Sequence, residues 1–128
     1  MTLSLVELAN RDYTEIARHA GRVTRLREGE VLFREGDEAR EAYVLLSGII
    51  EIRSHGRVIE VVQPGDGLGI LSLIDGRVRS ATATAAADCE VAALDERVFR
   101  FVVESTPGFV WFVMGEMAQR LRATNAAL

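Results

Sequence analysis

The chain has 128 residues, a formal net charge of −4, and 48% apolar residues. This length and apolar content fit one domain with one ordinary core. The net negative charge argues against direct binding to a nucleic-acid backbone. The longest apolar runs are far shorter than the roughly 20 residues that span a bilayer, so no membrane role is expected.

Two further features of the sequence restrict the cellular location and the kinds of site that are expected. The N-terminus shows no basic segment followed by an apolar run and a small-residue cleavage site, so we expect a cytoplasmic location. Cys89 is the only cysteine. This excludes an internal disulfide and any multi-cysteine metal site, and predicts a buried, inert thiol.

Residues 1–20 are predicted to be helical. Apolar and charged residues mix there with helical spacing, Ser4 is suited to cap the segment, and Gly21 to end it. From residue 21 to residue 94 the pattern changes to short apolar or alternating runs separated by glycines, which is typical of an antiparallel sheet. His55-Gly56 is predicted to be a tight hairpin. The candidate strands are 23–26, 31–34, 42–47, 49–54, 57–62, 81–87 and 89–94.

The helical period returns over residues 95–128. Asp95 is a candidate cap for one helix, and Thr106 followed by Pro107 predicts the start of a second. The sequence therefore predicts a mainly β fold with flanking helices, an antiparallel jelly-roll-like β-roll of about eight strands within a single domain 1–128. Aromatic residues of the second helix are expected to be core: Phe109, Trp111 and Phe112.

Residues 64–82 carry the most chemical information, because they combine several glycines with Arg79. Glycines beside a short helical turn permit close backbone approach, and free amides there can receive an anion. A nearby arginine can clamp a phosphate through two hydrogen bonds. This is the chemistry of a phosphate-binding cassette.

Several motifs occur together and in order along the chain. They are PGD at 64–66, LGILSL at 68–73, RSA at 79–81, LFREGD at 32–37, YVLLSG at 43–48, DCEVAALD at 88–95 and MAQRLRAT at 117–124. In this set the chain resembles the cyclic-nucleotide-binding domain family, most closely the effector domain of catabolite-activator-type (Crp/Fnr) regulators, without their helix-turn-helix domain. The resemblance covers nearly the whole chain.

The resemblance implies a ligand, cAMP or another cyclic nucleotide, and no required cofactor. It assigns the phosphate to Arg79 with Ser80, and the purine to Thr124 of the last helix. It also implies a homodimer through that helix, a possible protein partner, and no direct contact with nucleic acid. The implied ligand-binding set is Gly69, Ile70, Leu71, Arg79, Ser80, Ala81 and Thr124.

One position departs from the family pattern. The family's cassette glutamate, which binds the ribose 2′-hydroxyl, aligns with Ile70. An isoleucine cannot accept that hydrogen bond, and an unpaired buried hydroxyl costs about 1–3 kcal/mol. Read without the family, Arg79 would be a solvated or salt-bridged arginine. Arg120 and Arg122 are interpreted as a solvated helix face.

Three functions remain open from the sequence. The first is a sensor that changes its C-terminal helices when a cyclic nucleotide binds. The second is a degenerate pseudo-receptor that serves dimerisation or protein docking. The third is the effector-domain fragment of a Crp/Fnr-type regulator, since the chain leaves no room for a DNA-binding module after residue 128. An enzyme is not expected: His19 and His55 are isolated, and metal chemistry of the cupin kind needs clustered histidines.

Overall fold

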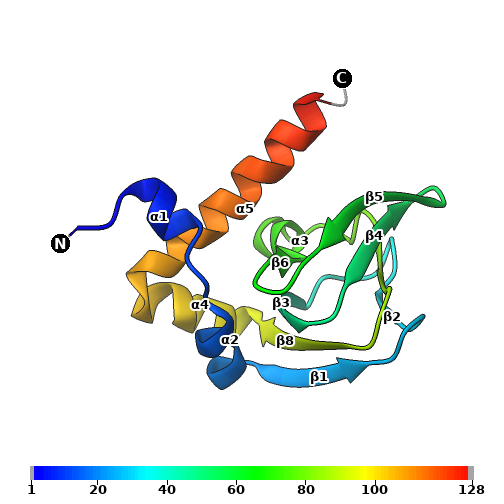
Figure 1. The fold of residues 1–128 in the computed structure, drawn as a ribbon, viewed down its shortest axis with the longest axis horizontal. Coiled ribbons are helices and arrows are strands. Elements are labelled where there is room, and N and C mark those ends of the chain that lie inside the picture. The colour runs from blue at the N-terminus through cyan, green and yellow to red at the C-terminus, as the bar shows by residue number, and fades with distance from the viewer. Residues whose placement is uncertain (1, 127–128) are drawn as a thin grey trace.

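The computed structural model describes the backbone of residues 2–126 and the side chains of residues 2–123. Within that range the chain forms a β-roll with helices gathered mainly at one end (Figure 1). The strands are β1 (Arg22–Leu26), β2 (Val31–Phe33), β3 (Glu41–Ser47), β4 (Ile50–Ser54), β5 (Arg57–Val62), β6 (Gly67–Leu68), β7 (Thr82–Ala85) and β8 (Cys89–Asp95). The helices are α1 (Leu5–Ala9), α2 (Thr14–Ala20), α3 (Ile70–Asp75), α4 (Glu96–Ser105) and α5 (Pro107–Ala126).

The strands form two four-stranded antiparallel sheets. One has the order β1-β8-β3-β6 and the other the order β2-β7-β4-β5. Their shared core includes Leu45, Ile50, Val62, Leu68 and Val91, each of which is fully buried. The predicted fold class is confirmed.

Local chemistry explains where the elements begin and turn. The hydroxyl of Ser4 accepts a hydrogen bond from the Glu7 N–H, and the Asp95 carboxylate accepts one from the Val98 N–H at 2.8 Å, so both predicted caps are confirmed. His55 and Gly56 both have positive φ, which the tight turn between β4 and β5 requires. The expected thiol burial is also confirmed, because Cys89 lies in the core.

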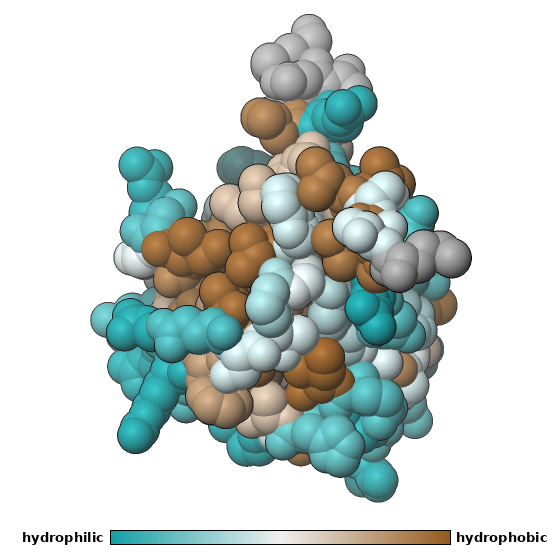
Figure 2. Space-filling view, turned by 90° about the vertical axis from the view of Figure 1, so that its left-hand side faces the viewer, coloured by the Kyte–Doolittle hydropathy of each residue, from teal (hydrophilic) through white to brown (hydrophobic). Residues whose placement is uncertain are grey.

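The helices pack around a second, aromatic core. Tyr13 lies edge-on to Phe109, with 5.4 Å between ring centroids, and contacts Phe112 in the same way. Phe109 and Phe112 are buried as predicted, whereas Trp111 is half-buried. Figure 2 looks from the side of α1, α2 and α4 and shows apolar side chains gathered among hydrophilic ones. Leu5 of α1 and Phe101 of α4 are exposed apolar residues. No helix in the described range is long and apolar enough to cross a membrane.

Candidate functional site

Six of the seven predicted ligand-binding residues lie around one small cavity. Gly69, Ile70 and Leu71 reach it from the start of α3, and residues 79–81 reach it from the segment before β7. The cavity measures about 50 Å³. Its lining is completed by side chains that the sequence did not indicate, namely Phe33, Ile52, Ser72 and Arg120. The side chain of Thr124 lies outside the described residues, so its predicted purine contact stays a prediction.

Gly69 brings the main chain against Arg79. Its φ of 71° lies in the left-handed region, just before α3 begins. A Cβ at this position would lie 2.6 Å from Nη1 of Arg79 and 3.4 Å from the Phe33 ring. Only glycine permits both the backbone conformation and the close approach of the arginine.

Arg79 is buried in the wall of the cavity, with 3% of its surface exposed. Its Nη1 donates a hydrogen bond to the Gly69 carbonyl at 2.8 Å, and its Nη2 donates one to the Glu41 carbonyl. The guanidinium carbon lies 4.3 Å from the centroid of the Phe33 ring, a cation–π distance. The alternative reading of Arg79 as a solvated or salt-bridged arginine is therefore wrong.

The charge of Arg79 has no carboxylate partner among the described residues, and its Nε has no hydrogen-bond partner. Burial lowers the pKa of the guanidinium, and Tyr43, Glu41 and Asp37 act in the opposite direction. An arginine nevertheless stays protonated in proteins. A buried cation that is held only by carbonyl dipoles and rings is a position where an anion would be stabilised.

Ile70 lines the cavity but packs mainly away from it. Its side chain is 5% exposed and belongs to an apolar cluster with Phe112 and Val113 of α5. A Cβ on Gly67 would lie 2.6 Å from Cδ1 of Ile70, which shows how tightly this side chain fits. The position that aligns with the family's glutamate is therefore part of the contact between α3 and α5.

Arg120 corrects one interpretation from the sequence. Its Nη1 lies 3.1 Å from Oε2 of Glu60 on β5, and the two side chains are only 28% and 35% exposed. Arg120 is thus a cavity residue that joins α5 to β5, whereas Arg122 is exposed as expected. Helical spacing could have indicated this, because position 120 lies one turn before the predicted purine contact.

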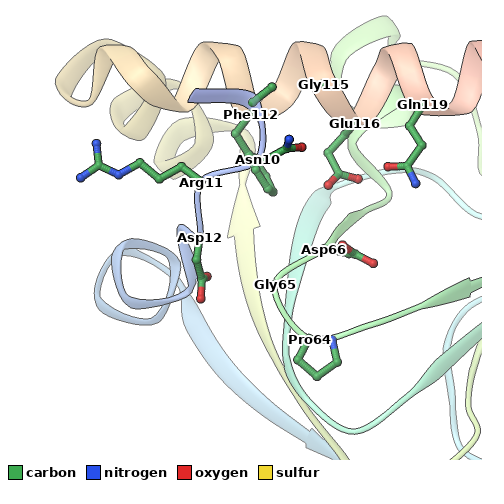
Figure 3. A pocket seen from close by; sticks show the side chains of 11 residues that line it. Asn10, Arg11, Asp12, Pro64, Gly65, Asp66, Phe112, Gly115, Glu116 and Gln119 are labelled. Atoms are coloured by element: carbon green, nitrogen blue, oxygen red, sulfur yellow. The ribbon is translucent and has the colours of Figure 1, made fainter. Parts of the chain in front are cut away.

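A second cavity of about 250 Å³ lies between residues 9–12, the turn 64–66 and α5. In Figure 3 the side chains of Glu116 and Gln119 point from α5 towards Asp66. Burial raises the pKa of the Glu116 carboxyl to about 7, and Asp66 and Glu60 add to this. The hydrogen bond with the Gly67 backbone and the charge of Arg120 act to lower it. No group of three or more metal-binding side chains occurs in the described part of the chain.

The fold and the first cavity together define a β-roll domain with a buried arginine in the cavity wall. A family model described as the cyclic nucleotide-binding domain matches residues 23–106. The chain belongs to this family.

Similar proteins extend the comparison. The chain is 33% identical over 78 residues to the cAMP-dependent protein kinase regulatory subunit of Eremothecium gossypii, covering 61% of this chain and 17% of that protein. It is 27% identical over 100 residues to the cAMP-activated global transcriptional regulator CRP of Salmonella typhimurium, covering 73% of this chain and 48% of that protein. The crystal structure of the Thermus thermophilus catabolite activator protein superposes with a TM-score of 0.80 at 25% identity, covering 97% of this chain and 61% of that one. The chain spans about half or less of the curated relatives described here.

Proposed function

We propose that the chain is a regulatory module that binds a cyclic nucleotide and receives its phosphate at Arg79. The observation that carries this proposal is the buried guanidinium of Arg79, which has no carboxylate partner among the described residues and lies beside Gly69 and Ser80 in the cavity wall. The names of the relatives support cAMP as the candidate ligand, since they include a cAMP-dependent kinase subunit and a cAMP-activated regulator. A binding role, with no catalysis by this chain, accords with these regulatory relatives.

Binding requires the cavity to open. Its volume of about 50 Å³ is well below the roughly 300 Å³ at which small-molecule sites begin. The phosphate would replace the carbonyl oxygens of Gly69 and Glu41 as acceptors from Arg79. Because Arg120 also lines the cavity, widening it displaces α5. This gives the proposed ligand-dependent change of the C-terminal helices a physical route.

The same observations favour one second candidate, a pseudo-receptor. Ile70 is packed into the α5 contact and both Nη atoms of Arg79 donate to carbonyls, so in the closed form only the Nε of the guanidinium lacks an acceptor. In that case the fold serves as a dimerisation or protein-docking module.

Calorimetric titration with cAMP separates the two candidates. We expect saturable binding by the natural chain and an affinity at least about thirtyfold weaker in Arg79→Gln, because losing a buried charge-assisted contact costs about 2–5 kcal/mol. Arg77→Gln is the matched control, since Arg77 is an exposed arginine in the same connection. Melting curves establish that each variant is folded. A folded natural chain that binds no cyclic nucleotide would establish the pseudo-receptor instead.

A homodimer through α5 is part of the proposal. Met114 and Leu121 are 50% and 63% exposed on this helix, whereas Val113 faces the protein's own core. Exposed apolar residues on a long helix are suited to an isologous contact. Light scattering should show a dimer for the natural chain and a monomer for the double variant Met114→Asp with Leu121→Asp. A natural chain that is monomeric at high micromolar concentration would exclude the dimer.

A further inference from the structure

The buried guanidinium of Arg79 lies against a pair of stacked aromatic rings. Its central carbon is 4.3 Å from the centroid of the Phe33 ring and 5.7 Å from that of the Tyr43 ring. The two rings are stacked on each other, with 6.0 Å between their centroids and 22° between their planes. Phe33 belongs to β2 in one sheet and Tyr43 to β3 in the other, so both sheets contribute to the contact with the arginine.

The contacts of Arg79 differ in whether a bound phosphate has to replace them. Its Nη1 and Nη2 donate hydrogen bonds to the carbonyls of Gly69 and Glu41, and the donors of a guanidinium lie in its plane. A phosphate binds through the same in-plane donors, so it competes with both carbonyls. An aromatic ring is attracted to the face of a guanidinium instead and takes up none of its N–H donors. The contact with Phe33 can therefore persist while a phosphate binds.

A carboxylate would hold Arg79 in a different way, because it would occupy the in-plane donors and neutralise the charge. Arg79 has no such partner among the described residues. The nearby Glu41 carboxylate instead accepts a hydrogen bond from the Tyr43 hydroxyl at 3.4 Å and pairs with Arg22 at 3.2 Å. The aromatic contact thus holds the arginine and leaves its charge for an anion.

We propose that Phe33 is a positioning residue: its ring holds the Arg79 guanidinium so that the N–H donors meet the phosphate of a bound cyclic nucleotide. This rests on the proposed function, because it assigns a role within the same site. The close packing at Gly69 supports it, since a Cβ there would lie 3.4 Å from the Phe33 ring and 2.6 Å from Nη1 of Arg79. Ring, guanidinium and the main chain before α3 therefore fit directly against one another.

The test measures cAMP affinity by calorimetric titration in two variants of Phe33. Phe33→Leu keeps an apolar side chain but removes the ring, and it should weaken binding about tenfold, because the guanidinium then lacks the contact that persists when the carbonyls are replaced. Phe33→Tyr keeps the ring and should recover most of the affinity that Phe33→Leu loses.

A double variant distinguishes positioning from direct contact, because Phe33 itself lines the cavity. If the ring acts through Arg79, adding Phe33→Leu to Arg79→Gln should weaken cAMP binding by less than about a further twofold. A full further loss of about tenfold in this background would mean that the ring contacts the ligand itself, and it would overturn the proposal.

Leu32→Ala is the matched control. Leu32 is the neighbour of Phe33 on β2 and is likewise half-buried against the core between the sheets, but it does not line the cavity. This variant should lower the melting temperature and leave cAMP affinity unchanged. Equal losses of affinity in Leu32→Ala and Phe33→Leu would overturn the inference and leave the proposed function intact. Absence of cAMP binding by the natural chain would overturn both.

Discussion

Helix α5 meets the rest of the molecule through two contacts of different character. The first is apolar and aromatic, where Phe109 and Phe112 pack against Tyr13 and Ile70. The second is polar, where Arg120 pairs with Glu60 and the Glu116 carboxyl accepts a hydrogen bond from the Gly67 backbone. Burial of large apolar side chains supplies several kcal/mol, whereas partly exposed ion pairs supply about 1 kcal/mol or less. The apolar contact therefore fixes the helix, and the polar contact is the one that pH can adjust.

The largest expected effect comes from breaking the apolar contact. Phe109 is 1% exposed and contacts Tyr13, Phe99 and Phe112, so Phe109→Ala should lower the free energy of unfolding by about 3–5 kcal/mol. Denaturant titration measures this. Phe101→Ala is the control, because Phe101 is 64% exposed on α4 and should change stability by less than about 0.5 kcal/mol. Equal decreases in the free energy of unfolding of the two variants would show that the aromatic cluster does not anchor α5.

Ile70→Glu tests whether the side chain at position 70 packs in the apolar contact with α5 or faces the bound ligand. The sequence leaves two outcomes open: cAMP affinity improved by about 1–3 kcal/mol, or a destabilised fold. Burial of Ile70 against Phe112 favours the second, with a loss of about 2–4 kcal/mol of stability. Leu71→Glu, on the 40% exposed neighbouring side chain, should be tolerated. Tighter cAMP binding at unchanged melting temperature would instead mean that the new carboxylate reaches the ligand.

Glu116 makes the polar contact sensitive to pH. Its pKa is raised from 4.5 to about 7, so between these pH values the folded chain holds a proton that the unfolded chain releases. The free energy of unfolding should therefore fall as the pH rises from about 4.5 to 7, and this contribution should level off above that. Glu116→Gln should remove this slope and stabilise the protein by about 1–2 kcal/mol at pH 8 but not at pH 4. If the free energy of unfolding depended on pH in the same way in the natural chain and in Glu116→Gln, this account would be contradicted.

The smallest effect is expected for the ion pair. A double-mutant cycle with Glu60→Gln and Arg120→Gln should give a coupling energy of about 0.5–1 kcal/mol in the free protein, because both side chains are partly exposed. High salt should reduce that value. A coupling energy above about 3 kcal/mol would mean that the polar contact holds α5 as strongly as the apolar contact does, and would contradict the comparison.

The β-roll could be predicted because its signals are local. Alternation, glycine turns and caps such as Ser4 and Asp95 each depend on residues close in sequence. Strand β6 escaped prediction, because two residues, Gly67 and Leu68, carry no period. The segment 64–82 could be predicted as a site for the same reason, since its glycines and Arg79 are near one another in the chain.

The pairing of Glu60 with Arg120 and the direction of the Ile70 side chain could not be found in this way. Glu60 and Arg120 are far apart in sequence and come together only when α5 lies against β5. The direction of the Ile70 side chain also depends on packing, because an isoleucine in a cassette motif does not reveal which wall it joins. Tertiary contacts decide both cases.

The hydrogen bonds of Arg79 have a consequence for the time course of binding. The guanidinium donates to the carbonyls of Gly69 and Glu41 in the closed form, and both contacts must break before a phosphate can take their place. If opening is slower than encounter, the observed association rate should reach a plateau as ligand concentration rises, and that plateau equals the opening rate. The apparent affinity is then the intrinsic affinity reduced by the fraction of molecules that are open.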